Sequence, residues 1–99
     1  MAITMTDAAS KWFRDELALP AGAGIRFFGK VYGKTNVHDG FSVGMTRDDK
    51  PAEVVEDFLK DGIHYYVTAG DAWFFNGLDM AVDYDAHRDE PVYTFSEQG

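Results

Sequence analysis

The chain has 99 residues, of which 45% are hydrophobic and 15% aromatic, and it contains no cysteine. This length and composition predict one compact globular domain over residues 1–99, and the lack of cysteine excludes disulfides, thiolate nucleophiles and metal sites with sulfur ligands. The formal net charge of −8 disfavours a nucleic-acid partner, because nucleic-acid binding depends on Lys and Arg side chains that neutralise phosphates.

The same composition bears on membranes and partners. No stretch approaches the roughly 20 apolar residues that a membrane helix needs. The N-terminal segment carries Asp7, Lys11 and Arg14 where a signal peptide would have an apolar core. We therefore expect a cytoplasmic protein with no membrane partner. The negative charge could attract a basic partner or a cation, and a solubilising surface is the simpler interpretation.

The N-terminal segment predicts a short strand followed by a helix. Residues 2–5 fit the strand, and Thr6 or Asp7 is the expected N-cap of a helix over residues 7–18. Trp12 is the largest apolar group on the expected inner face of this helix, so we expect it to anchor the core. The apolar residues that recur at helical spacing are Ala8, Trp12, Phe13 and Leu17.

Residues 24–46 predict a β-hairpin with a long tip. Apolar and polar residues alternate along residues 25–32 and again along residues 41–46. The polar, glycine-bearing stretch Gly33–Gly40 separates them. We therefore expect two antiparallel strands joined by a loop.

The second half of the chain predicts further strands joined by short turns. Residues 53–59 fit either a helix or a strand, and periodicity does not decide between them. Asp61-Gly62 is typical of a hairpin turn. The other expected elements are a strand at 63–67, a short helical segment at 69–75, a turn at Asn76-Gly77, and strands at 78–84 and 92–95.

Three stretches match parts of known functional motifs. Residues 24–30 have the spacing of a phosphate-binding loop, but such a loop leads from a strand into a helix, and here a strand is expected. Residues 40–44 match the G-x-S-x-G of hydrolases, but Ser42 is expected within a strand and not at a turn into a helix. The acidic stretch 83–89 lacks the glycine of a calcium loop, since Arg88 stands there. We interpret all three as coincidences.

The order of elements and several short sequences resemble the HesB/IscA-like family, the A-type carriers of iron-sulfur cluster assembly. The resemblance rests on Gly-Ile-Arg-Phe at 24–27, the Asp-Gly turn and strand at 61–67, and Asn-Gly-Leu-Asp at 76–79, and it spans residues 2–95. It implies a mostly β (α+β), HesB-like compact domain, with two small, mainly antiparallel sheets and one N-terminal helix packed against them. It also implies a strand at 53–59.

Carriers of this family hold iron with three cysteines, and this sequence has none. The resemblance places the first near Lys34 and the other two beyond Ser96. Iron-sulfur clusters need soft thiolate ligands. The resemblance therefore implies the fold without the cluster. We expect a non-catalytic protein with no cofactor, which acts through an unknown protein partner and has its only link to iron-sulfur cluster assembly through such contacts.

Histidines next to carboxylates offer an alternative function. His38 and Asp39 lie in the Gly33–Gly40 loop, His64 lies on an expected strand, and His87 lies in the acidic stretch near the C-terminus. Imidazole and carboxylate groups bind zinc or iron(II) when they converge. The alternative is therefore a small-ligand or metal-binding protein that uses this loop and the histidines.

The aromatic residues exceed what one small core requires. Some of them are therefore expected to line a pocket or a self-association face, which would make the protein a homo-oligomer. The residues expected at an interaction surface or pocket are Lys34, Asn36, His38, Tyr66 and Trp73.

Overall fold

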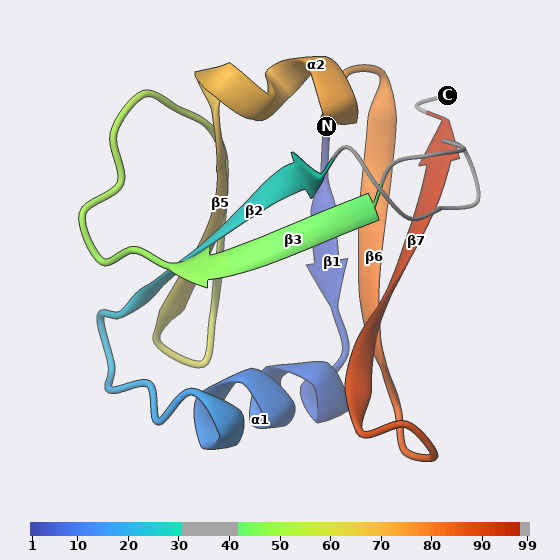
Figure 1. Cartoon of the computed structure of the whole chain (residues 1–99). Helices are drawn as coiled ribbons and strands as arrows, with labels where there is room; N and C mark the ends of the chain where they lie inside the picture. Colours follow the sequence, from blue (N-terminus) through green and yellow to red (C-terminus); the bar gives the residue numbers. More distant parts are fainter. Residues whose placement is uncertain (31–41, 98–99) are drawn as a thin grey trace.

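Two β-sheets face each other, and a helix closes each end of the pair (Figure 1). The computed structural model describes residues 1–30 and 42–97. Its elements in chain order are β1 (Ile3–Met5), α1 (Asp7–Glu16), β2 (Gly24–Lys30), β3 (Ser42–Arg47), β4 (Val54–Lys60), β5 (Ile63–Thr68), the 3-10 turn η1 (Ala69–Asp71), α2 (Ala72–Phe75), β6 (Leu78–Asp85) and β7 (Glu90–Glu97).

The larger sheet has the strand order β3-β2-β5-β4 and the smaller one the order β1-β6-β7. The hairpin pairs β2–β3, β4–β5 and β6–β7 are antiparallel, whereas β2–β5 and β1–β6 are parallel. The expected fold class, a mostly β protein with two small, mainly antiparallel sheets and an N-terminal helix, is confirmed. Among the helices that the structure describes, none is long and apolar enough to cross a membrane.

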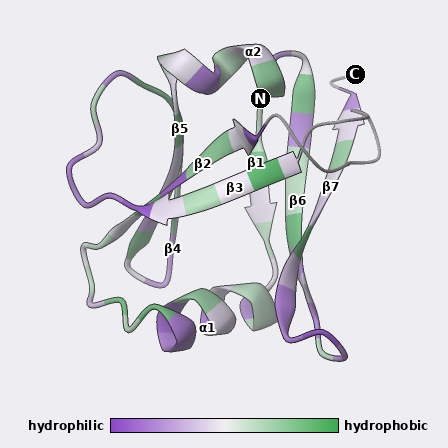
Figure 2. Ribbon diagram, viewed as in Figure 1, coloured by the Kyte–Doolittle hydropathy of each residue, from purple (hydrophilic) through white to green (hydrophobic). Residues whose placement is uncertain are grey.

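An aromatic cluster fills the space between the sheets and α1. Phe13, Phe27 and Tyr65 are fully buried. The ring centroid of Phe13 lies 5.5 Å from that of Tyr65 and 6.1 Å from that of Phe27, both in edge-on geometry. Hydrophobic and hydrophilic bands alternate along β6 (Figure 2), and its inward side chains Met80 and Val82 are buried in the same core. Alternation in the sequence therefore corresponds to the two faces of the strands.

Helix α1 begins where the sequence predicts, because Thr6 is its N-cap and the Thr6 hydroxyl accepts a hydrogen bond from the Ala9 N–H at 3.2 Å. The helix ends at Glu16, two residues before the expected residue 18.

The expectation that Trp12 anchors the core is wrong. Trp12 is half-buried, and Phe13 is the large side chain that α1 buries. Neighbouring residues on a helix point about 100° apart, so only one of the two can face the sheets directly. Trp12 lies at the margin of the core, where its indole N–H donates to the Asp89 carbonyl oxygen at 3.0 Å.

The other expected elements are present, with shifted ends. Residues 24–30 and 42–47 form the antiparallel pair β2–β3, and the rest of that expected hairpin lies outside the described residues. Residues 54–60 form a strand and not a helix, because β4 pairs with β5 through the Asp61-Gly62 turn. The last strand is longer than expected and begins at Glu90.

Packing explains the glycines in two of the coincidental motifs. A Cβ atom on Gly29 would lie 2.7 Å from a ring carbon of Phe74, and a Cβ atom on Gly44 would lie 2.4 Å from the ring of Phe28. Aromatic rings therefore occupy the space that side chains at these positions would need. Residues 24–30 are a strand and Ser42 is the first residue of β3, as the interpretation of both matches as coincidences requires.

Candidate functional site

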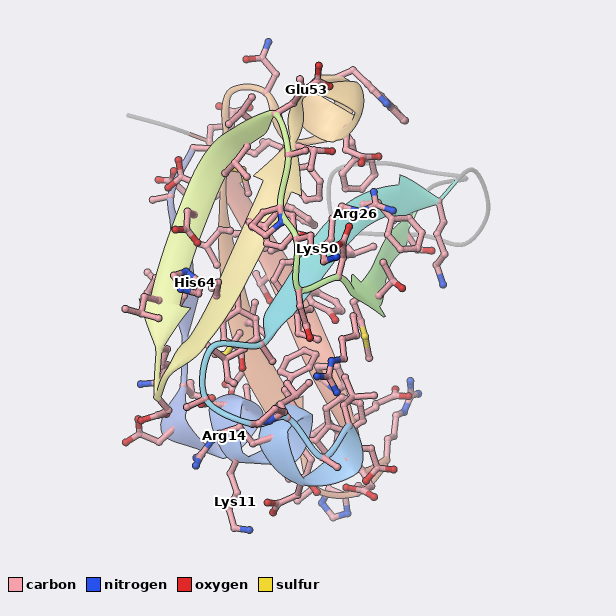
Figure 3. All side chains as sticks on the ribbon, turned by 90° about the vertical axis from the view of Figure 1, so that its left-hand side faces the viewer. Lys11, Arg14, Arg26, Lys50, Glu53 and His64 are labelled. Carbon is pink, nitrogen blue, oxygen red and sulfur yellow. The ribbon has the colours of Figure 1, made fainter. Side chains whose placement is uncertain are left out.

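Two of the four expected site residues in the described part of the chain, His64 and Tyr66, lie on one face of the larger sheet. We call this face, which is turned away from the smaller sheet, the outer face (Figure 3). Arg26 of β2 and His64 of β5 lie on it, and the register pairs Arg26 with Tyr66 and Gly24 with His64. Their neighbours Ile25 and Tyr65 point into the core, as the period of two along a strand requires.

Tyr66 is buried on the outer face and fastens a loop to it. Its hydroxyl donates to the Asp48 carbonyl oxygen at 2.8 Å. The Gly24 N–H donates to Asp49 Oδ1 at 3.0 Å, and the Asp48 N–H donates to the Gly24 carbonyl oxygen at 2.9 Å. Burial, followed by the nearby Asp48, raises the pKa of Tyr66 to about 12. Tyr66 therefore stays neutral at physiological pH and contributes to the structure of this loop.

Arg26 also ties the outer face together. One of its terminal nitrogens lies 3.0 Å from Asp71 Oδ2, which joins β2 to the turn η1. Its guanidinium carbon lies 5.2 Å from the ring centroid of Phe28, a cation–π distance. Both charged side chains are mostly buried. This ion pair holds the Arg26 guanidinium in one position, which indicates a structural role for Arg26.

The described histidines are not brought together. Nδ1 of His64 lies 3.4 Å from both carboxylate oxygens of Asp57 on β4. His87 lies in the turn between β6 and β7 of the other sheet, where its backbone N–H donates to Asp85 Oδ1 at 2.9 Å. Within residues 1–30 and 42–97, no group of three or more His, Asp or Glu side chains is placed to hold a metal ion.

Four of the expected site residues cannot be placed. Lys34, Asn36, His38 and Asp39 lie outside the described residues, and so does the rest of the Gly33–Gly40 loop. The alternative function that uses this loop therefore stays a prediction.

Large exposed apolar side chains are found on α2 and on β4. Trp73 of α2 is 53% exposed and contacts the Phe74 ring edge-on, with 5.6 Å between the centroids. On the edge strand β4, Val54, Val55 and Leu59 are 40%, 52% and 61% exposed. Trp73 was expected at a contact surface, whereas the β4 residues were not. Their exposure depends on which strand forms the edge of the sheet, and the local sequence carries no signal of that.

A groove between α1 and the tip of the β6–β7 hairpin is the second feature that the sequence did not indicate. This groove has a volume of about 350 Å³. Its lining joins residues that are far apart in the chain, which explains why no motif shows it. The lining residues are Ala8, Lys11, Trp12, Asp15, Glu16, Tyr84 and Asp89.

Comparison with known proteins identifies the family. The sequence is 36% identical over 95 residues to a protein of Bacillus subtilis strain 168 described as a pyruvate dehydrogenase inhibitor, and the match covers 96% of this chain and 99% of the relative. This chain belongs to the family of that inhibitor. Uncharacterised proteins of Staphylococcus aureus strain USA300 and Staphylococcus epidermidis are each 31% identical, with 95% and 94% of this chain covered and 98% and 97% of theirs. No protein-family model matches the sequence.

Two solved structures support the fold that the sequence predicts for this chain. Escherichia coli SufA, involved in the biosynthesis of iron-sulfur clusters, matches with a TM-score of 0.60 and 21% identity over 97% of this chain and 80% of SufA. IscA with a [2Fe-2S] cluster matches with a TM-score of 0.56 and 14% identity over 96% and 81% of the two chains. The HesB/IscA-like fold is therefore confirmed, and at this identity the likeness concerns the fold alone.

Proposed function

We propose that the chain is a non-catalytic inhibitor of a pyruvate dehydrogenase and that it acts by binding this enzyme. The observation that carries the proposal is the 36% identity to the Bacillus subtilis inhibitor along almost the whole of both chains. The alignment spans both sheets and both helices, so it includes the surfaces that the fold presents to a partner.

The chemistry of the described side chains supports action through contacts. The chain has no cysteine, so it lacks the thiolates by which A-type carriers hold iron. On the outer face, the Tyr66 hydroxyl donates a hydrogen bond to the Asp48 carbonyl oxygen, and Arg26 donates one to the Asp71 carboxylate. Both interactions hold neighbouring segments against the sheet, so their role is structural. The exposed apolar side chains on β4 and α2 are of the kind that protein interfaces bury.

The fold likeness to SufA and IscA favours a second candidate, a role near iron-sulfur cluster assembly that needs no bound cluster. This candidate predicts binding to a protein of that assembly pathway and no effect on pyruvate oxidation. A metal- or ligand-binding role through His38 and the Gly33–Gly40 loop predicts one tight site for zinc or iron(II). Homo-oligomerisation and a cytoplasmic location also stay predictions.

A reconstituted assay separates these possibilities. The purified protein is mixed with pyruvate dehydrogenase from the cell that makes it, and complex formation is followed by size-exclusion chromatography while the rate of pyruvate oxidation is measured. We expect co-elution and a rate that falls as the protein is added. Protein unfolded by heat is the control. An unchanged rate at a large molar excess, with separate elution, would exclude the inhibitor role.

A further inference from the structure

The groove between α1 and the β6–β7 hairpin combines aromatic walls with carboxylates. Trp12 and Tyr84 are its two half-buried aromatic side chains. Asp15, Glu16 and Asp89 bring carboxylates to it, and Lys11 is its single basic lining residue. Aromatic side chains beside carboxylates are the combination that receives a cationic group.

One residue of the hairpin holds both aromatic walls. The carbonyl oxygen of Asp89 accepts the Trp12 indole N–H at 3.0 Å, and its carboxylate accepts the Tyr84 hydroxyl at 2.7 Å. The Trp12 ring also contacts the buried ring of Phe13 edge-on, with 5.1 Å between the centroids. The groove is therefore formed before any partner arrives, which reduces the entropy lost on binding.

The charge of the groove is negative and is not fully compensated. Lys11 forms an ion pair with Asp15 along α1. Among residues 1–30 and 42–97, the Glu16 carboxylate has no ion pair or hydrogen bond, and Asp89 accepts hydrogen bonds only from the neutral donors of Trp12 and Tyr84. The hydrogen bond to Asp89, together with burial and the charges of Asp89, Asp85 and Glu16, raises the pKa of Tyr84. The Tyr84 hydroxyl therefore keeps its proton to a higher pH than an ordinary tyrosine, as expected in a negative potential.

We propose that this groove receives an arginine side chain from a basic segment of the partner protein. The inference rests on the proposed function, since the partner is then pyruvate dehydrogenase. A guanidinium group is planar, so it can stack on the Trp12 or Tyr84 ring while it donates two hydrogen bonds to a carboxylate such as that of Glu16. The ammonium group of lysine is a compact point charge and makes only part of this set of contacts. The net charge of −8 also attracts a basic segment over a longer range.

Two charge reversals test the site of contact. Glu16 and Glu53 are both exposed, and Glu53 lies at the end of the molecule opposite to α1 (Figure 3). Glu16→Lys and Glu53→Lys therefore change the net charge equally at distant places. In about 50 mM salt, where screening is weak, Glu16→Lys should raise the Kd for pyruvate dehydrogenase about tenfold and Glu53→Lys less than twofold. Equal effects of the two variants would overturn the inference.

A peptide titration tests the groove without the enzyme. The indole N–H signals of Trp12 and Trp73 are recorded by NMR, assigned with a Trp73→Phe variant, while a tetra-arginine peptide is added. The Trp12 signal should shift, the Trp73 signal should not, and Glu16→Lys should abolish the shift. A tetra-citrulline peptide, which is planar but neutral, should leave both signals unchanged.

The two tests together separate the possible failures. A Trp12 signal that does not respond to the arginine peptide, or responds equally to citrulline, overturns the groove as an arginine site. An equal response to tetra-lysine overturns the preference for a guanidinium group. If the peptide shifts Trp12 while pyruvate dehydrogenase neither binds nor slows, the proposed function fails and the arginine site stands.

Discussion

Replacing Phe13 and Trp12 in turn tests how α1 attaches to the sheets. Phe13→Ala removes a fully buried ring that contacts Phe27 and Tyr65, and such a truncation costs about 3–5 kcal/mol. Domains of this size have about 5–15 kcal/mol of stability in total, so this variant should lose a large fraction of its stability. Trp12→Ala removes a half-buried ring and one hydrogen bond to Asp89, so we expect a cost of about 1–2 kcal/mol.

Urea unfolding followed by far-UV circular dichroism measures both costs. Circular dichroism is preferred to fluorescence because Trp12 is one of the protein's two tryptophans. The free energy of unfolding should fall at least about twice as far for Phe13→Ala as for Trp12→Ala. A Trp12→Ala variant as unstable as Phe13→Ala would show that Trp12 anchors the helix and would refute the packing described above.

Three further predictions concern a glycine, a tyrosine and the absent thiolates. Gly29→Ala should lose about 1–3 kcal/mol in urea unfolding because its Cβ would meet Phe74, whereas Gly70→Ala, with open space around it, should be nearly neutral; equal costs would contradict the close packing. Unfolded tyrosine has a pKa near 10, so the stability that Tyr66 contributes is complete below pH 10 and is lost as the pH rises towards 12. Tyr66→Phe should therefore reduce the fall in the free energy of unfolding between about pH 9 and 11.5, and an unchanged fall would contradict this account. Incubation with iron and sulfide should leave the protein colourless, and a brown product with bound iron would contradict the requirement for thiolates.

Local patterns predicted the elements because each depends on few residues. Strand β5 follows directly from alternation after the Asp61-Gly62 turn, and α1 begins at the Thr6 cap that its side chain suggests. Residues 54–60 were ambiguous because their apolar residues suit either period. Pairing with β5, a contact within the tertiary structure, makes them a strand. The resemblance to the carrier family had implied this result.

Surface features escaped the sequence because they combine distant parts of the chain. Trp12 and Asp89 are 77 positions apart, yet together they form the groove. Adjacent positions on a helix are both compatible with one apolar pattern, so spacing alone did not show that Phe13 and not Trp12 faces the sheets. The exposure of Leu59 likewise depends on β4 lying at the edge of its sheet.

The dependence of inhibition on molar ratio is the most direct test of a non-catalytic inhibitor. Pyruvate oxidation is measured while the protein is added from about one tenth to ten equivalents, and the inhibited mixture is then diluted. Inhibition by binding requires about one inhibitor for each enzyme site that it occupies, sets in without progressive inactivation, and is reversed by dilution as the complex dissociates. Loss of activity that proceeds with time at one tenth of an equivalent and persists after dilution would mean that the protein modifies its target, and would contradict the account.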